Sequence, residues 1–232
     1  MCELLSGKVL LLDYYNNKVK LVDINYKVIF NLDLATKPLG ICNVTPNEVA
    51  VASEGCTIKF LNVNNRNIVE GRKLKFEHRC TGIAHSKCSL YVTTFTALYH
   101  YTLDGKLMKK IYEDTSNPLS VYKFAVSDFF GTRLYVINYS KNKLLTLSRD
   151  GTVLSSVEDS ALIRPTGVHV SETGQLLVWG HDSNTVVQID GEVRVLDSEI
   201  DGIYHPKSVY YSARTGRLIV GLFDNILVIH TR

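Results

Sequence analysis

The residue types that bind metal ions or act as nucleophiles occur together in two short stretches of this sequence. In the first, HRCTGIAHSKC, the side chains of His78, Cys80, His85 and Cys88 are of the kinds that bind zinc. Residues 81–85 are expected to form a strand, however, and a rise of about 3.3 Å per residue would place Cys80 about 16 Å from His85. A zinc ion needs its ligands about 2 Å away. We therefore expect no metal site in this stretch.

The second stretch, His181-Asp182-Ser183, contains the three residue types of a serine-hydrolase triad. Adjacent residues in one turn rarely face each other, so we interpret the stretch as a loop. His169 lies between two valines of an expected inner strand, and no carboxylates occupy the matching positions of the other repeats. A metal or hydrolase centre needs several such groups in register. The sequence thus predicts no catalytic residue, no metal and no cofactor, and a protein that is not an enzyme.

A third set of side chains suits recognition of a partner. It stands before the turn that begins each repeat and in a second series of turns expected on the same face. The first series is Lys37, Arg79, Asn117, Arg164 and His205, with Lys207 close by, and the second is Tyr14, Tyr15, Lys18, Phe95, Tyr139, Lys141, His181 and Phe223. Cations among aromatic rings suit single-stranded RNA, and they also suit a protein with acidic and aromatic anchors. Solvated loops whose rings cover gaps between repeats are the third interpretation.

A second basic group lies in NNRNIVEGRKLKFEHR. Its members are Arg66, Arg72, Lys73, Lys75 and Arg79. They are expected on an outer strand and its preceding turn, where charges commonly prevent edge-to-edge aggregation. A ligand-binding role is the alternative.

A sequence repeat positions these loops. Six apolar anchors, spaced 40, 41, 44, 42 and 42 residues apart, are Val9, Val49, Leu90, Leu134, Leu176 and Leu218. Two residues after each anchor stands a second apolar residue, and these are Leu11, Val51, Val92, Val136, Val178 and Val220. Apolar residues at i and i+2 lie on one face of a strand. Each repeat therefore contains at least one buried strand.

The remainder of each repeat predicts three more strands. A turn such as PTGV at Pro165 precedes the anchor, and proline belongs at the start of a strand because it has no N–H to donate. A third strand such as TVVQID follows, and in four repeats an asparagine, which tolerates left-handed backbone, precedes it. Asp-Gly at residues 104, 150 and 190 then indicates a hairpin, and a fourth strand such as TVLSSVED follows.

Four antiparallel strands in about 42 residues form a small sheet that cannot bury both of its faces alone. Radial packing of such sheets gives an all-β propeller, here with six blades, whereas a β-sandwich would not require repeats of constant length. We predict one domain over residues 1–232, with blades at about 1–35, 36–78, 79–115, 116–161, 162–203 and 204–232. Aligning the repeats starts the chain inside the innermost strand of the first blade and leaves the last blade without its outer strand. We expect the chain to be the C-terminal domain of a larger protein or a truncated copy.

The composition is that of an ordinary soluble domain. Apolar residues make up 45% of the 232 residues and charged residues 21%, and the net charge of +3 is too small to indicate nucleic acid binding by itself. No run approaches the roughly 18 apolar residues of a membrane span, and the N-terminus lacks the features of a signal peptide. Five cysteines without framework spacing favour a reducing, cytoplasmic environment.

The repeat resembles a known family. A Pro-x-Gly-Val/Ile turn, an alternating inner strand, Asn-x-x-Val and Asp-Gly are similar to the NHL-type propeller repeat, over nearly the whole chain. No Trp-Asp dipeptide of the WD40 type and no paired glycines of the kelch type occur. The stretches PTGVHVSETGQLLVWGHDSNTVVQID and SVYYSARTGRLIVGLFDNILVIHTR are similar to the C-terminal propellers of tripartite-motif (TRIM) proteins.

The resemblance implies a recognition module. In TRIM proteins a RING, B-boxes and a coiled coil precede the propeller, the RING recruits ubiquitin-charged enzymes, and the propeller selects protein or RNA targets. This sequence has no cysteine/histidine ladder for the zinc modules, so it could not act as a ligase by itself. The resemblance therefore implies a propeller that binds a protein partner as the substrate-selecting end of a TRIM-like ligase, with RNA binding as the alternative.

Overall fold

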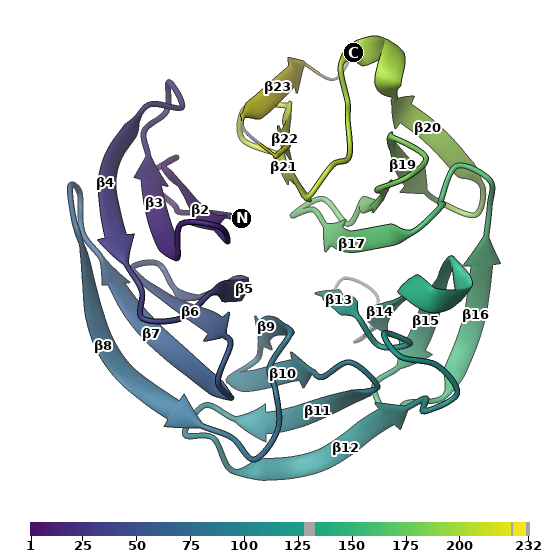
Figure 1. Ribbon diagram of the computed structural model, residues 1–232, viewed down its shortest axis with the longest axis horizontal. Helices are drawn as coiled ribbons and strands as arrows, with labels where there is room; N and C mark the ends of the chain where they lie inside the picture. Colours follow the sequence, from purple (N-terminus) through teal and green to yellow (C-terminus); the bar gives the residue numbers. More distant parts are fainter. Residues whose placement is uncertain (128–132, 224, 231–232) are drawn as a thin grey trace. The chain divides into compact units, whose positions relative to one another are not determined.

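The chain folds into six antiparallel sheets. The computed structural model describes residues 1–127, 133–223 and 225–230. Each sheet is a meander in which strands that are consecutive in the chain lie side by side, as Figure 1 shows. The described helices are two short 3-10 turns, η1 (Tyr139–Lys141) and η2 (Glu199–Asp201). None of the described helices is long and apolar enough to cross a membrane.

The first three sheets have four strands each. The first contains β1 (Cys2–Glu3), β2 (Val9–Asp13), β3 (Lys18–Val22) and β4 (Val28–Asp33). The second contains β5 (Pro38–Thr45), β6 (Glu48–Ser53), β7 (Thr57–Val63) and β8 (Ile68–Lys75). The third contains β9 (Gly82–Ser86), β10 (Ser89–Thr93), β11 (Ala97–Thr102) and β12 (Leu107–Glu113).

The last three sheets repeat the pattern, and the final one has three strands. The fourth contains β13 (Lys123–Ser127), β14 (Arg133–Asn138), β15 (Lys143–Ser148) and β16 (Val153–Glu158). The fifth contains β17 (Pro165–Val170), β18 (Leu176–Gly180), β19 (Thr185–Ile189) and β20 (Val193–Asp197). The sixth contains β21 (Ser208–Ser212), β22 (Arg217–Gly221) and β23 (Ile226–His230).

The chain groups into two compact units. The first consists of Met1–Thr94 with Leu98–Lys110, and the second of Phe95–Ala97 with Ile111–Arg232. Within each unit the first strands of successive sheets pack together, as between β5 and β9 or between β13 and β17. The last strands of these sheets lie on the outer side of their unit in Figure 1.

The apolar anchor residues of the repeat lie in the second strands of the sheets, as predicted. All six lie in a second strand and are buried, with exposures between 0% for Leu218 and 7% for Leu176. Five of the six residues that alternate with the anchors are buried too, and Tyr135 is half-buried. In the second unit, strand β18 has a neighbouring sheet on both faces. Leu177 therefore packs with Val220 of the sixth sheet, whereas Val178 packs with Ile137 of the fourth. This packing of sheet on sheet forms the core of the second unit.

The turns follow the expected chemistry, with one difference. Asn17, Asn142 and Asn184 have φ values of 54°, 53° and 54°, in the left-handed region that asparagine tolerates. Pro38 and Pro165 are the first residues of β5 and β17. Pro118, in contrast, precedes β13 by five residues, because the intervening segment forms a turn in which the Ser120 hydroxyl donates a hydrogen bond to the carbonyl of Asp114.

The glycine of the Pro-x-Gly turn has a packing role in the fifth sheet. A Cβ atom on Gly167 would lie 2.0 Å from Cζ2 of the Trp179 ring, which fills the space above the strand. Only glycine lets the indole lie against the backbone of β17 at this distance. The sixth sheet has Ser208 at the corresponding position and Gly221 in place of the tryptophan.

The two ends of the chain agree with the repeat alignment. β1 is paired with β2 as the innermost strand of the first sheet and begins at Cys2, the residue after Met1. Among the described residues, the sixth sheet ends at its third strand, β23.

Candidate functional site

Four loops of the second unit bring a compact group of polar side chains together. Tyr139 begins η1 after β14, and Arg164 directly precedes β17. His181 and Asp182 directly follow β18. His205 and Lys207 lie in the segment between η2 and β21. We call these six residues, Tyr139, Arg164, His181, Asp182, His205 and Lys207, the Arg164 cluster.

Asparagine side chains fix the backbone of this cluster. Oδ1 of Asn142 accepts a hydrogen bond of 2.9 Å from the backbone N–H of Arg164, and Oδ1 of Asn184 accepts one of 2.9 Å from that of His205. Arg164 and His205 each precede a proline, where extended backbone is usual, yet their φ values are 49° and 45°. Left-handed backbone costs roughly 1–2 kcal/mol for such residues. The hydrogen bond from the preceding sheet offsets this cost and sets the direction of each side chain.

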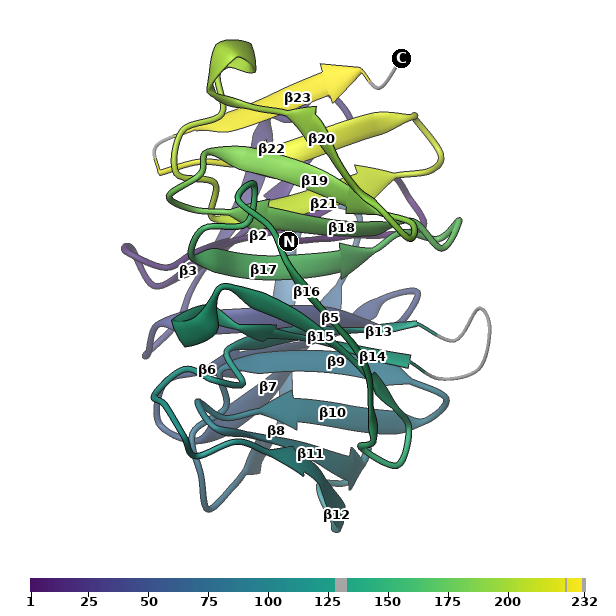
Figure 2. The ribbon, with the colours of Figure 1, turned by 90° about the vertical axis from the view of Figure 1, so that its right-hand side faces the viewer.

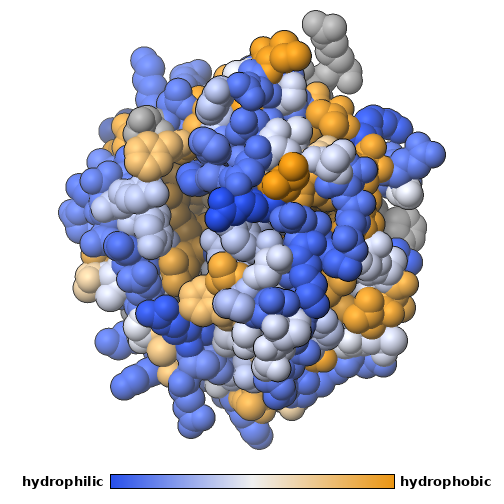
Figure 3. Space-filling model, turned by 45° about the vertical axis from the view of Figure 1, so that its right-hand side comes forward, coloured by the Kyte–Doolittle hydropathy of each residue, from blue (hydrophilic) through white to orange (hydrophobic). Residues whose placement is uncertain are grey.

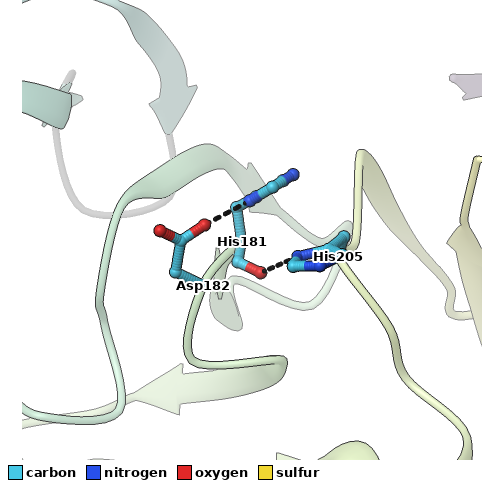
Figure 4. Close-up of side chains that lie close together, drawn as sticks. All are labelled: His181, Asp182 and His205. Carbon is cyan, nitrogen blue, oxygen red and sulfur yellow. Dashed lines mark hydrogen bonds and ion pairs between the residues drawn. The ribbon is translucent and has the colours of Figure 1, made fainter.

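A linear chain of polar contacts connects the charged groups. Nη1 of Arg164 lies 2.9 Å from Oδ2 of Asp182. Nδ1 of His181 lies 2.5 Å from Oδ1 of the same carboxylate, and Figure 4 draws this second contact. Nζ of Lys207 lies 2.8 Å from Nε2 of His181. An ammonium group can only donate, so Nε2 is the acceptor and the imidazole carries its proton on Nδ1. The His181 ring thus connects an ammonium group to a carboxylate.

The two histidines of the cluster also contact each other. Their ring centroids are 4.5 Å apart with an interplanar angle of 25°, and Nδ1 of His205 lies 3.0 Å from the carbonyl oxygen of His181. That carbonyl can only accept, so Nδ1 of His205 is the donor. Tyr204 packs edge-on against the outer side of His205 at 5.8 Å. The stacking holds both rings in defined orientations.

The charges of the cluster act on one another. The hydrogen bond from His181, and then that from Arg164, lowers the pKa of Asp182. The Asp182 carboxylate raises the pKa of Arg164, and partial burial of its amine lowers the pKa of Lys207. Arg164 also lies over the Tyr139 ring, with Cζ 5.4 Å from its centroid. One carboxylate faces two cations, so the cluster presents net positive charge.

The cluster contains three residues of metal-ligating type. His181, Asp182 and His205 each offer a ligand atom within 4.8 Å of the others, and no other such group of three occurs in the part of the chain that the structure describes. Two of the three groups already have partners, however, because Asp182 accepts from Arg164 and His181 while Nε2 of His181 accepts from Lys207. A divalent cation would also have to approach two positive side chains. The existing hydrogen bonds and the two neighbouring cations thus oppose binding of a metal ion here.

The His181-Asp182-Ser183 loop differs in one respect from its prediction. The first two residues do face each other although they are adjacent, because the chain turns sharply after β18 and Asp182 N donates back to the carbonyl of Ile163. The hydroxyl of Ser183 donates instead to the carbonyl of Ala161 at 2.8 Å. Its oxygen is therefore not directed at the imidazole, and no nucleophile–base pair forms in this loop.

The other residues predicted for recognition make contacts outside the Arg164 cluster or are described by their exposure. In the first unit, Nζ of Lys37 lies 5.0 Å from the centroid of the Tyr14 ring, and Tyr15 packs edge-on against Tyr14 at 5.2 Å. Arg79 is exposed in the same unit, before β9. In the second unit, Phe95 is half-buried, and Lys141 donates to the Ser116 hydroxyl at 3.2 Å.

The second basic group is partly used for structure. The Arg72 guanidinium lies 3.6 Å from the centroid of the Phe60 ring and donates to the carbonyl of Leu103 at 2.7 Å. Lys73 and Lys75 are exposed on β8. This distribution fits a charged outer strand.

On the face of the molecule shown in Figure 3, hydrophobic side chains form small groups separated by hydrophilic ones.

The first strands of the second unit carry two further titratable groups. Burial lowers the pKa of His169 to about 4, and its ring lies 4.6 Å from that of Tyr210. Lys123, on β13, is partly accessible as a residue, but desolvation of its amine lowers its pKa to about 8. His169 was considered above as a metal ligand, and it belongs to no ligand group among the described residues.

Comparison with known proteins identifies the fold. No protein-family model and no curated protein sequence matches the chain. Among solved structures, a chain of the nidogen/laminin complex superposes with a TM-score of 0.76 at 13% identity, covering 97% of this chain and 89% of that one. Virginiamycin B lyase from Staphylococcus aureus gives 0.68 at 14% identity, covering 98% and 82%. The chain is a six-bladed β-propeller. At these identities the likeness establishes the fold alone.

The propeller assignment explains what the sequence could and could not reveal about the site. Its blades are the six sheets, and the loops of the Arg164 cluster connect successive strands of the last three. The sequence predicted five of the six cluster residues from their places before and within the turns. It missed Asp182, whose role depends on a contact with Arg164 from a different turn. It also missed the asparagine hydrogen bonds, since asparagine before the third strand suggested only a turn residue.

Proposed function

We propose that this propeller is a non-enzymatic recognition platform that binds a protein partner through the Arg164 cluster. The fold is compatible with protein binding, and a propeller neighbour comes from a complex between proteins, nidogen and laminin. The neighbours also include enzymes, virginiamycin B lyase and the glutaminyl cyclase of Myxococcus xanthus. In the loop that most resembles a triad, the Ser183 hydroxyl donates to a backbone carbonyl, which supports a non-enzymatic role.

The observation that carries this proposal is the placement of Arg164. Its guanidinium is fixed by the Asp182 carboxylate and the Tyr139 ring, yet its side chain keeps 54% of its exposure. A guanidinium presents five donors in a rigid fork that matches a carboxylate, and holding it in place lowers the entropy lost on binding. Lys207 supplies a second cation through the same network. The cluster therefore suits a partner segment that carries acidic side chains.

RNA binding is less well supported by the same contacts. Single-stranded RNA is held by bases that stack on open aromatic faces. Arg164 lies over the Tyr139 ring, and Lys37 lies over the Tyr14 ring in the first unit. Two of the aromatic faces that the sequence offered for stacking are thus in contact with cations of the protein itself.

The finer proposal is that this propeller selects the substrates of a TRIM-like ubiquitin ligase. Its support is the resemblance of the repeats to NHL-type TRIM propellers. A RING, B-boxes and a coiled coil in a full-length relative would supply the ligase activity, and the Arg164 cluster would hold the target. The target class proposed here is an acidic segment of a protein.

Binding to two labelled probes tests the choice between protein and RNA. The probes are an unstructured peptide rich in glutamate and tyrosine and a single-stranded RNA, titrated with increasing salt. We expect saturable peptide binding that weakens about tenfold in an Arg164→Gln variant, while the exposed Glu172→Gln variant binds like the wild type. RNA binding whose log affinity falls by about 0.7 per phosphate contact with log salt, without peptide binding, would refute the proposal.

A further inference from the structure

The loop that leads from the fifth blade to the sixth holds an isoleucine in the solvent. Ile200, in the middle of η2, keeps 97% of its exposure, more than any other large apolar residue that the structure describes. Figure 2 shows η2 projecting beyond the end of β20. The loop between the fourth and fifth blades has Asp159 in this place, six residues before its proline. A single exposed apolar residue is ordinary in a protein, so its support and its neighbours decide what it can bind.

The turn that carries Ile200 is held by several contacts. Oδ2 of Asp201 accepts one hydrogen bond of 2.9 Å from the backbone N–H of Ser198 and another of 3.2 Å from its hydroxyl. The N–H of Ile203 donates to the carbonyl of Ser198 at 3.2 Å. The Ile203 side chain is fully buried in the core between the fifth and sixth blades. Because the turn is fixed in this way, little conformational entropy would be lost when Ile200 contacts a partner.

A second exposed ring connects this turn to the Arg164 cluster. Tyr204 is 55% exposed, and its ring packs edge-on against that of His205. The Tyr204 hydroxyl is hydrogen-bonded to the carboxylate of Glu199, which also accepts a bond of 3.2 Å from the side-chain amide of Asn184. Oδ1 of Asn184 in turn holds the backbone N–H of His205. One asparagine therefore fixes both η2 and a histidine of the cluster.

The Tyr204 ring and the ammonium group of Lys207 are close enough for one short segment to reach both. The centroid of the His205 ring lies 5.8 Å from that of Tyr204 and 4.5 Å from that of His181. Nε2 of His181 lies 2.8 Å from Nζ of Lys207. These steps limit the distance between the Tyr204 ring and the Lys207 amine to about 14 Å, which about four residues of extended chain can span.

We propose that Ile200 and Tyr204, which we call the η2 ledge, bind a large apolar side chain of the partner segment whose acidic side chain binds the Arg164 cluster. This inference rests on the proposed function and specifies its partner. An aromatic side chain offers the most apolar area for the exposed ring and isoleucine to cover. The positive charge of the neighbouring cluster favours carboxylates beside that anchor. The segment therefore has an aromatic or large aliphatic residue within about four residues of a glutamate or aspartate.

Two labelled peptides test this inference on the 232-residue chain. One is EEGSWSGEE, with glutamates on both sides of a tryptophan, and the other has serine in place of the tryptophan. We expect the wild-type chain to bind the tryptophan peptide at least fivefold more tightly. Ile200→Ser and Tyr204→Ser should each reduce this preference to less than twofold and leave the affinity for the serine peptide unchanged. Leu154→Ser, which changes a 54% exposed leucine on β16 of the same unit, is the matched control and should keep the preference.

Three outcomes would overturn the inference. The first is equal affinity of the wild-type chain for the two peptides, and the second is a loss of preference in Leu154→Ser as large as that in Ile200→Ser. The third is a chain that is dimeric without peptide and monomeric as Ile200→Ser, which would identify a second copy as the occupant of the η2 ledge. The proposed function has a separate test, because it predicts that Arg164→Gln weakens the binding of both peptides. Unchanged affinities in that variant would refute the proposed function itself.

Discussion

Arg164 and Asp182 are joined by the first hairpin of the fifth blade. Arg164 directly precedes β17 and Asp182 is the second residue after β18, and the pairing of Pro165 with Gly180 brings their side chains to a separation of 2.9 Å. The rigid sheet therefore determines a contact between two loops. It fixes the guanidinium while leaving part of it exposed, which is the arrangement that a recognition site requires.

Replacing Asp182 with asparagine should change how stability depends on pH. The pKa of the folded-state carboxyl is lowered by His181 and Arg164. Its stabilising effect is therefore present above the unfolded pKa of about 3.9 and is lost as pH falls through the lower folded value. Urea unfolding should show Asp182→Asn to be less stable than the wild type at pH 7, and the difference should shrink as the pH is lowered below the unfolded pKa. A difference that stays constant over this range would contradict the assignment.

Asn142 should contribute in two separable ways. Alanine at this position removes the hydrogen bond to Arg164 N and places a less tolerant residue in left-handed backbone, so we expect a loss of about 1–2 kcal/mol in the free energy of unfolding. The Asn142→Gly variant relieves the backbone cost and lacks only the amide. It should be more stable than the alanine variant, while both weaken peptide binding at Arg164 to a similar extent. Equal stability of the two variants would count against the left-handed constraint.

Gly167 should tolerate no side chain. The Cβ atom of Gly167→Ala would lie 2.0 Å from the Trp179 ring, and overpacking of this kind costs about 1–3 kcal/mol or more. We expect a clear fall in the midpoint of thermal unfolding. Ser208→Ala, at the corresponding position of the sixth blade, should leave the midpoint nearly unchanged. If both variants unfold like the wild type, the indole does not occupy the position described.

The five free cysteines should differ in their reactivity. Burial raises the pKa of Cys2 and that of Cys80 to about 12 each, and it also raises the pKa of Cys42. Cys88 is exposed. Because the thiolate is the reactive form, iodoacetamide at pH 8 should modify Cys88 first and the three thiols with raised pKa only after unfolding, as measured by peptide mass spectrometry. Early modification of Cys42 in the folded chain would contradict its burial.

The fold could be predicted from the sequence because each feature of the repeat has a local cause. Val9 and its five counterparts are buried in second strands, Asn142 and Asn184 adopt left-handed turns, and Pro165 begins a strand. The turn after Pro118 differs because the Ser120 hydroxyl donates a hydrogen bond to the carbonyl of Asp114, a contact that the repeat pattern does not specify.

The site could be predicted only in part, for a physical reason. Exposed cations and rings in turns can be read from the repeat, so Arg164, His205 and Tyr139 were found. The partner of each side chain depends on contacts between turns that are far apart in the sequence. The hydrogen bonds that Arg164 donates to Asp182 and that Lys207 donates to His181 are of this kind. No local pattern of residues specifies such contacts.

The most direct test of the recognition role is a comparison of captured proteins by quantitative mass spectrometry. The wild-type chain, an Arg164→Gln/Lys207→Gln variant and a Lys73→Gln/Lys75→Gln control would be used on the same cell extract. The two variants lose the same charge, but the control pair lies on the exposed outer strand β8. We predict that a defined set of proteins with acidic segments is lost with the first variant and retained with the control. Identical sets for all three proteins would contradict the proposal that the Arg164 cluster binds the partner.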